Sequence, residues 1–233
     1  MQTVTGLDYG LLKTMLQEQA GTFVLPFLAA AAVAYLCGCF NGSVIVSKYI
    51  LRDDVRDHGS GNAGLTNFHR TFGGPLTAVV ILTDVLKAVA ALWAAMLIFG
   101  AFFPVESGMV LFAKYWAALF CLLGHMFPCM FGFKGGKGIL SGGTIAIMID
   151  WRIALVVWGG FLILVLLTRY VSLGSVWAGG SFPFISWYCY PDPFIVVLAF
   201  LCGGLVVWKH RGNIKRLLNG TESKFQLRSR KQK

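Results

Sequence analysis

The chain has 233 residues, of which 57% are apolar and only 13% are charged. An average soluble domain carries roughly 25% charged residues, and a core of this length cannot hide so much apolar side chain. The composition excludes an ordinary soluble globule, a disordered chain and a coiled coil, and it indicates an all-α, polytopic integral membrane bundle. The net charge of +10 favours a lipid bilayer and an anionic substrate over nucleic acid, because the basic residues lie between apolar segments.

Before the first apolar segment lies an N-terminal extension, residues 1–22. Leu11, Leu12, Met15 and Leu16 in it have helical spacing. That pattern fits an interfacial helix, and it fits a poorly ordered extension equally well, so both interpretations stay open.

Seven apolar segments follow, and a bilayer-spanning helix needs about 20 apolar residues. They cover residues 23–47, 76–103, 109–124, 138–150, 152–168, 173–190 and 193–209. The fourth is short, so we expect it to be tilted, extended backwards or broken near its start. The sequence thus predicts a membrane domain of about seven transmembrane helices, residues 23–209, and a cytoplasmic motif with a basic tail, residues 210–233.

The distribution of Lys and Arg predicts the orientation of these helices. Sixteen of the 20 basic residues lie in residues 48–75, 125–137 and 169–172 or from residue 209 onwards. Cytoplasmic loops are enriched in Lys and Arg, so these segments are predicted to face the cytoplasm. The N-terminus is then outside the cell and the C-terminus inside, and every unusual polar motif falls on one face.

The first of these segments reads HGSGNAGLTNFHR, residues 58–70. Glycines let backbone amides approach a ligand and form a concave nest for an anion, and the neighbouring side chains add donors for phosphate oxygens. A flexible turn would explain the glycines but not the donors beside them. The candidate binding residues are Gly59, Ser60, Gly61, Asn62, Gly64, Thr66, Asn67 and Arg70.

The second segment contains GHMFP, residues 124–128, and then FKGGKG, residues 133–138. Glycines ahead of a helix N-terminus, with lysines beside them, can bind an anion through amides and helix dipole together. The spacing is not that of a nucleotide-binding P-loop, and lysines snorkelling at a membrane edge are the alternative. The candidates are Lys134, Gly135, Gly136, Lys137 and Gly138.

Two further segments and one charged pair are less specific. The third segment reads RYVSLGS, residues 169–175, and an Arg and a Tyr at a membrane interface are ordinary. His210 and Asn213 have i,i+3 spacing and can share a helix face, although a basic tail on anionic lipid is the alternative. Asp84 and Lys87 have the same spacing inside an apolar segment. Charges within the bilayer are functional by default, and a mutual buried ion pair is the interpretation that we favour here.

Taken together and in order, these stretches resemble the bacterial membrane glycerol-3-phosphate acyltransferases that use acyl phosphate, the PlsY family, over about residues 30–225. The resemblance implies a seven-helix enzyme of the bacterial inner membrane with its active site facing the cytoplasm. It implies acyl transfer from acyl phosphate to the 1-hydroxyl of sn-glycerol 3-phosphate, giving lysophosphatidic acid and phosphate in the first acylation of phospholipid synthesis. No cofactor and no metal are expected, and contact with the enzyme that forms acyl phosphate is suggested.

The same resemblance implies roles for individual residues. Ser60, Arg70, His210 and Asn213 would be catalytic, the GGKG loop would bind glycerol 3-phosphate, and Ser172 would help to hold a phosphate. Acyl phosphate is already activated, so positioning and charge neutralisation are what the site must supply. Either His210 or the leaving phosphate itself would take the proton of the attacking hydroxyl.

The chain departs from the family pattern at Cys39 and Asn41, near the inner end of the first span, and at Gly212, where Glu is common. Two alternatives to an enzyme fit these motifs less well. A transporter of a phosphorylated solute predicts polar residues towards the bilayer midplane and two related halves, neither of which is evident. A non-catalytic lipid-binding scaffold leaves the donor-rich first loop unexplained.

Overall fold

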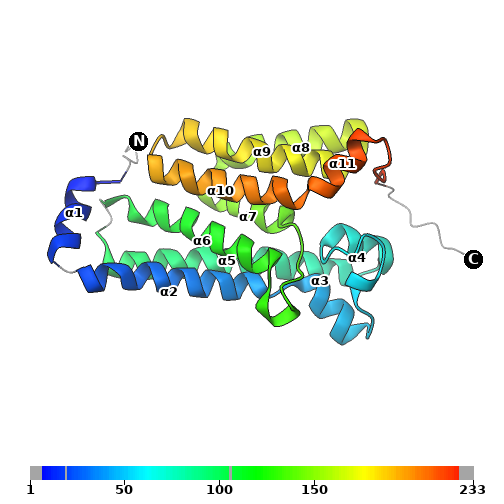
Figure 1. Ribbon diagram of the computed structural model, residues 1–233, viewed down its shortest axis with the longest axis horizontal. Helices are drawn as coiled ribbons and strands as arrows, with labels where there is room; N and C mark the ends of the chain where they lie inside the picture. The colour runs from blue at the N-terminus through cyan, green and yellow to red at the C-terminus, as the bar shows by residue number, and fades with distance from the viewer. Residues whose placement is uncertain (1–6, 19, 105–106, 226–233) are drawn as a thin grey trace, which may run out of the picture.

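The structure is a computed structural model that describes residues 7–18, 20–104 and 107–225, and within these ranges it contains helices and no strand. The longer helices are α1 (Tyr9–Glu18), α2 (Ala20–Cys39), α5 (Leu76–Phe102), α6 (Met109–Met126), α7 (Ile139–Ile149), α8 (Trp151–Thr168), α9 (Val171–Cys189) and α10 (Pro193–Lys209). The shorter ones are α3 (Gly42–Ile45), a π-helix (Val46–Ile50), α4 (Leu65–Thr71), α11 (Arg211–Leu218) and 3₁₀ turns at Val55–Asp57 and Cys129–Phe131. Figure 1 shows the long helices side by side, with α3, α4 and α11 at one end and α1 at the other.

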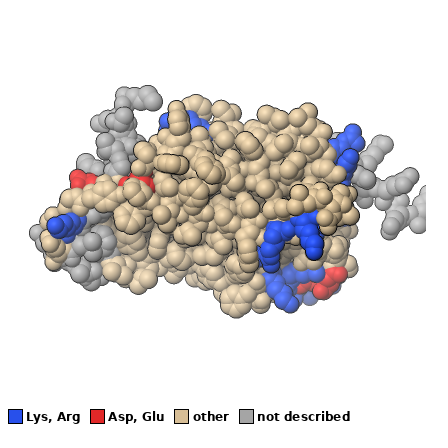
Figure 2. Space-filling model, turned by 45° about the horizontal axis from the view of Figure 1, so that its top comes forward, with Lys and Arg blue, Asp and Glu red and all other residues tan. Residues whose placement is uncertain are grey.

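The outer surface of the bundle is apolar. Leu166 and Leu167 of α8 are each 78% exposed, and Figure 2 shows few charges along the helices, with most visible Lys and Arg near the end that carries α4 and α11. Such a surface is unfavourable in water but matches lipid tails. Within the described residues, three helices are long and apolar enough to cross a membrane, or five if each bent pair is one span. The chain is therefore a membrane protein, while the seven spans and their orientation stay predictions.

The first apolar segment is broken. α2 ends at Cys39, and the helix that follows is bent by 41° from it. The buried Asn41 caps the new helix, because its Oδ1 accepts from the Val44 N–H at 3.1 Å while its Nδ2 donates to the Ala63 carbonyl at 3.0 Å. The predicted span over residues 23–47 is therefore broken at residues 40 and 41, and Asn41 holds the first polar loop.

Glycines bring α2 and α6 into backbone contact. A Cβ on Gly38 would lie 2.2 Å from the Cys121 carbonyl oxygen, and one on Gly124 would lie 2.1 Å from that of Tyr35. Small residues allow this close approach of membrane helices. It fixes the end of α6, which carries His125, against the break after α2.

The short fourth segment starts abruptly. Residues 132–138 are not helical, and α7 begins directly after Gly138, whose φ of +80° lies in the left-handed region. A backward extension of this helix is therefore excluded. The N-terminus of α7 points towards the same end of the bundle as α4 and α11.

At the opposite end, α1 confirms a helix in the N-terminal extension. The Leu7 N–H and the Tyr9 hydroxyl both donate to the Asp192 carboxylate, at 3.3 and 2.7 Å. These bonds tie the start of α1 to the start of α10. The interfacial interpretation rests on the side chains of Leu11, Leu12, Met15 and Leu16, which the structure does not describe, and residues 1–6 and 226–233 lie outside the described ranges.

Candidate active site

A cavity of about 720 Å³ lies where the four predicted cytoplasmic segments meet. The predicted residues that line it are Gly59, Ser60, Asn62, Gly64, Thr66, Asn67, Arg70, Lys137, Gly138, Ser172, His210 and Asn213. Segments that are far apart in the sequence thus form one site. Gly61, Lys134, Gly135 and Gly136 do not line the cavity.

Asn67 holds the first loop in shape through hydrogen bonds to its backbone. Its Oδ1 accepts from the Ser60 N–H, and its Nδ2 donates to the carbonyls of Val55 and His58, each at 3.0 Å. Its side-chain oxygen and nitrogen are therefore both hydrogen-bonded within the protein. Gly59 has a φ of +56°, and a Cβ there would lie 2.4 Å from Asn67 Oδ1, so this loop shape requires glycine.

Arg56, which the sequence analysis missed, joins the first loop to the second. It donates to the Phe131 carbonyl at 2.7 Å and forms a 2.7 Å ion pair with Asp54, whose pKa is lowered mainly by the hydrogen bond from Arg56. A weaker bond reaches the Lys134 carbonyl at 3.4 Å. Lys134 itself is exposed and lies outside the cavity, so the structure does not support it as a ligand of a bound phosphate.

The glycines of the second loop are needed for close packing. The N–H of Gly135 donates to the Met126 carbonyl at 3.2 Å, and that of Gly136 to the His125 carbonyl at 3.1 Å. Neither amide is left for an anion, so the expected amide cradle is wrong at these two positions. A Cβ on Gly136 would lie 2.3 Å from His125 Nε2 and 2.7 Å from the Ala63 carbonyl oxygen. The glycine therefore lets the first and second loops meet.

The chain end closes the cavity. Lys137 donates a short hydrogen bond to Asn213 Oδ1, and Asn213 Nδ2 donates to Glu222 Oε1 at 2.7 Å. Arg216 forms a 2.6 Å ion pair with Glu222. Arg70 donates to the Ser223 carbonyl at 3.3 Å. Arg216 and Glu222 also line the cavity but were not among the predicted site residues. Glu222 supplies a carboxylate to a segment that has Gly212 where Glu is common.

His210 has a defined tautomer. It is 3% exposed, follows the last residue of α10, and its Nδ1 lies 2.8 Å from the Val206 carbonyl oxygen. A carbonyl only accepts, so Nδ1 must carry the proton, and in the neutral ring Nε2 is a hydrogen-bond acceptor. His210 thus offers the cavity an acceptor.

The charges around the cavity leave a positive excess. The predicted Asp84–Lys87 ion pair is confirmed at 2.6 Å, with both side chains buried. Glu222 is paired with Arg216. Among the described residues, Arg70 and Lys137 line the cavity without an acidic partner. The cavity therefore suits an anion such as a phosphate.

Lys137 gives this site a pH dependence. It lies in the loop outside the spans, where burial foremost, and then the charge of Arg216, lowers its pKa to about 8. Above that pH the ammonium is lost, so we expect the KM for a phosphorylated substrate to rise between about pH 8 and pH 9.5. Lys137→Arg, which stays charged, should abolish this rise. A KM of the unmodified protein that is flat over this range would contradict the assignment.

An apolar helical bundle with an anion-binding cavity at one end of its helices defines an integral membrane protein that handles a phosphorylated substrate. The chain belongs to the glycerol-3-phosphate acyltransferase family, whose sequence profile matches residues 28–220. Membership supports acylation of glycerol 3-phosphate and a place in phospholipid biosynthesis, and it disfavours the transporter and scaffold interpretations.

Individual relatives agree with the family profile. The chain is 39% identical over 203 residues to the glycerol-3-phosphate acyltransferase of Clostridioides difficile, covering 87% of this chain and 97% of that one. The Thermoanaerobacter pseudethanolicus enzyme is 34% identical over 195 residues, 84% and 93% of the two chains. The crystal structure of PlsY (YgiH), an integral membrane glycerol 3-phosphate acyltransferase, in its glycerol 3-phosphate form matches with a TM-score of 0.75 at 30% identity, over 86% and 96% of the chains. Its lysophosphatidic acid form has a TM-score of 0.72.

Proposed function

We propose that this protein transfers the acyl group of an acyl phosphate to the 1-hydroxyl of sn-glycerol 3-phosphate, releasing lysophosphatidic acid and phosphate. The observation that carries this proposal is a cavity lined by Arg70 and Lys137, two cations with no acidic partner among the described residues, directly beside an apolar space between the helices. Both proposed substrates carry phosphate, and one of them also carries a fatty tail.

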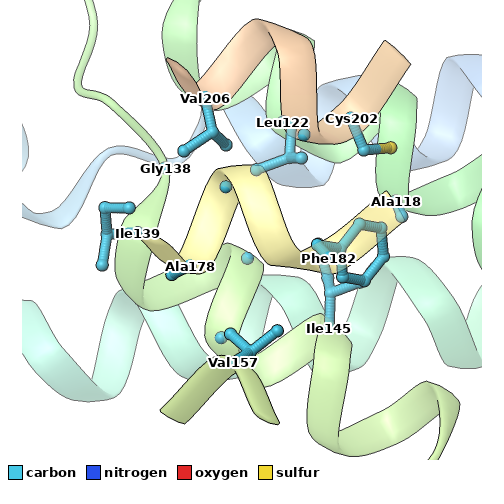
Figure 3. A pocket seen from close by; sticks show the side chains of 14 residues that line it. Ala118, Leu122, Gly138, Ile139, Ile145, Val157, Ala178, Phe182, Cys202 and Val206 are labelled. Atoms are coloured by element: carbon cyan, nitrogen blue, oxygen red, sulfur yellow. The ribbon is translucent and has the colours of Figure 1, made fainter. Parts of the chain in front are cut away.

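The apolar space is a small cavity of about 30 Å³ between α6, α7, α8, α9 and α10 (Figure 3). Gly138 and Ile139 line both cavities, and Leu122, Phe182 and Val206 are among the apolar walls. A cavity of this size takes only a short part of an acyl chain. In the proposed complex the chain lies mainly along the apolar helix surfaces, with its reactive end at Gly138, beside the basic groups.

The reaction balances without a protein nucleophile. In the ground state the C1 hydroxyl of glycerol 3-phosphate donates its hydrogen bond to His210 Nε2, which orients it for attack. As the hydroxyl oxygen bonds to the acyl carbon, the bond from that carbon to the phosphate oxygen breaks. The hydroxyl proton is transferred either to His210 Nε2 or, after the hydrogen bond has shifted, to the leaving phosphate. Arg70 and Lys137 stabilise the charge on phosphate, with Asn213 positioning Lys137 and the hydroxyls of Ser60 and Ser172 as further donors.

The cellular setting belongs to the same proposal. The positive segments around the cavity support an orientation with the site facing the cytoplasm of a bacterial cell and embedded in its inner membrane. A soluble enzyme that forms acyl phosphate can then deliver its product from the same side. Residues 23–209 act as the membrane domain, and residues 210–233 complete the site and extend as a basic tail.

Substitution of the acyl donor tests the proposed reaction. Purified protein should form lysophosphatidic acid from acyl phosphate and glycerol 3-phosphate, and acyl-CoA or acyl carrier protein thioester in place of acyl phosphate should yield none. The Arg70→Ala variant is the control for contaminating acyltransferases, because it should lose the activity. Equal rates with acyl-CoA in a preparation that passes this control would overturn the proposed donor.

A further inference from the structure

A buried polar cluster forms the inner wall of the cavity. Asp84 and Lys87 of α5 and His125 of α6 are 2%, 5% and 2% exposed. Lys87 Nζ bonds to Asp84 Oδ1 at 2.6 Å, to the Phe40 carbonyl at 3.1 Å and to His125 Nδ1 at 2.6 Å. The three donors of the ammonium are thereby satisfied. Asp84 and His125 line the cavity, whereas Lys87 lies behind them.

Lys87 determines the tautomer of His125. An ammonium only donates, so Nδ1 of His125 accepts and the neutral ring carries its proton on Nε2. Nε2 faces the second loop, since a Cβ on Gly136 would lie 2.3 Å from it. In the ranges that the structure describes, Nε2 has no protein partner. His125 thus presents a fixed N–H donor, the opposite of the acceptor that His210 presents.

Asp84 and His125 line the same part of the cavity wall, where His125 Nδ1, the atom that accepts from Lys87, lies 3.8 Å from Asp84 Oδ1. A phosphate has only acceptors when fully ionised and would be repelled by the carboxylate. A hydroxyl both donates and accepts, so it matches the two groups together. The chemistry of this wall therefore selects a hydroxyl.

We propose that Asp84 and His125 bind the C2 hydroxyl of glycerol 3-phosphate and so make the enzyme specific for a glycerol backbone, with Lys87 as the positioning residue that holds His125 in its donor tautomer. This rests on the proposed function, in which the C1 hydroxyl hydrogen-bonds to His210, so the C2 hydroxyl is the one left for Asp84 and His125.

The test compares glycerol 3-phosphate with 3-hydroxypropyl phosphate, which lacks only the C2 hydroxyl, by calorimetric binding to the purified full-length protein. The unmodified protein should bind glycerol 3-phosphate about 100-fold more tightly, because the analogue leaves buried polar groups unpaired. His125→Asn keeps an acceptor for Lys87 but does not reach the Nε2 position, so the ratio should fall to about 1. His125→Gln places an amide N–H near that position and should restore much of the preference.

Ser141→Ala is the matched control. The Ser141 hydroxyl donates to the Asp84 carbonyl at 3.1 Å and does not line the cavity, so its loss disturbs the same helix pair without changing the ratio. A folded His125→Asn protein that discriminates like the unmodified one would overturn the proposal. Equal weakening of both ligands would also overturn it, since that result indicates a purely structural role.

Because binding needs no acyl donor, the two proposals fail separately. A protein that prefers glycerol 3-phosphate but is inactive with acyl phosphate supports the hydroxyl site and overturns the proposed reaction. A protein that is active with acyl phosphate but binds the two phosphates equally overturns the hydroxyl site alone.

Discussion

Replacing His210 by Ala is expected to lower kcat by about 10²–10⁴-fold, the range that a positioned acid–base or orienting group supplies. The side chain is buried and its Nδ1 is committed to the Val206 carbonyl, so Nε2 is the atom that meets substrate. Steady-state kinetics with saturating substrates, together with thermal unfolding in detergent to confirm folding, would measure the loss.

A second substitution separates the two roles left open for His210. Its Nε2 is the acceptor, and the amide oxygen of Gln can occupy a similar position without being a useful base. If His210 only orients the hydroxyl, His210→Gln should retain much of the activity, because the amide oxygen accepts the same hydrogen bond. A variant as inactive as His210→Ala would instead identify His210 as the proton acceptor.

Gly136→Ala is expected to cause the second large loss, about 10²-fold in kcat/KM, a size typical of a site displaced by about 1 Å. Its Cβ would lie 2.3 Å from His125 Nε2 and 2.7 Å from the Ala63 carbonyl oxygen, and the second contact is with backbone that cannot rotate away. The two loops must separate, which should raise the KM for glycerol 3-phosphate more than it lowers kcat.

Gly204→Ala provides the comparison, because a Cβ at this helical position in α10 meets nothing within 4 Å. It should leave the kinetics unchanged and raise stability slightly, since Ala is favoured over Gly in a helix by roughly 0.5–1 kcal/mol. An unchanged KM in a folded Gly136→Ala protein would show that the contact between the loops is dispensable.

The helices of the bundle could be predicted because bilayer thickness sets a minimum length for an apolar run. The break at Asn41 could not be predicted, since an Asn among apolar residues gives the same sequence pattern whether it packs against a neighbouring helix or caps a new one. Its role depends on the Ala63 carbonyl, which belongs to a loop that only the tertiary structure brings close.

Much of the site was predictable from the charge count, which placed Arg70 and His210 on the same face before any contact was known. The predictions that were wrong or incomplete depended on hydrogen-bond partners that the sequence does not reveal. Glycine-rich sequence suggests free amides, yet those of Gly135 and Gly136 pair with the end of α6. Arg56 and Glu222 were missed because their partners lie in distant or backbone positions that spacing does not reveal.

The bond from Arg70 to the Ser223 carbonyl and the carboxylate of Glu222 also bear on when the enzyme becomes active during its synthesis. A ribosome adds these residues after every long helix of the bundle. A nascent chain that ends before residue 210 lacks the His210 acceptor and the segment that holds Asn213 against Lys137. In the proposed mechanism, acyl transfer therefore has to wait until residues 210–223 have been added, and a product that ends before them would be a helical bundle without a complete site.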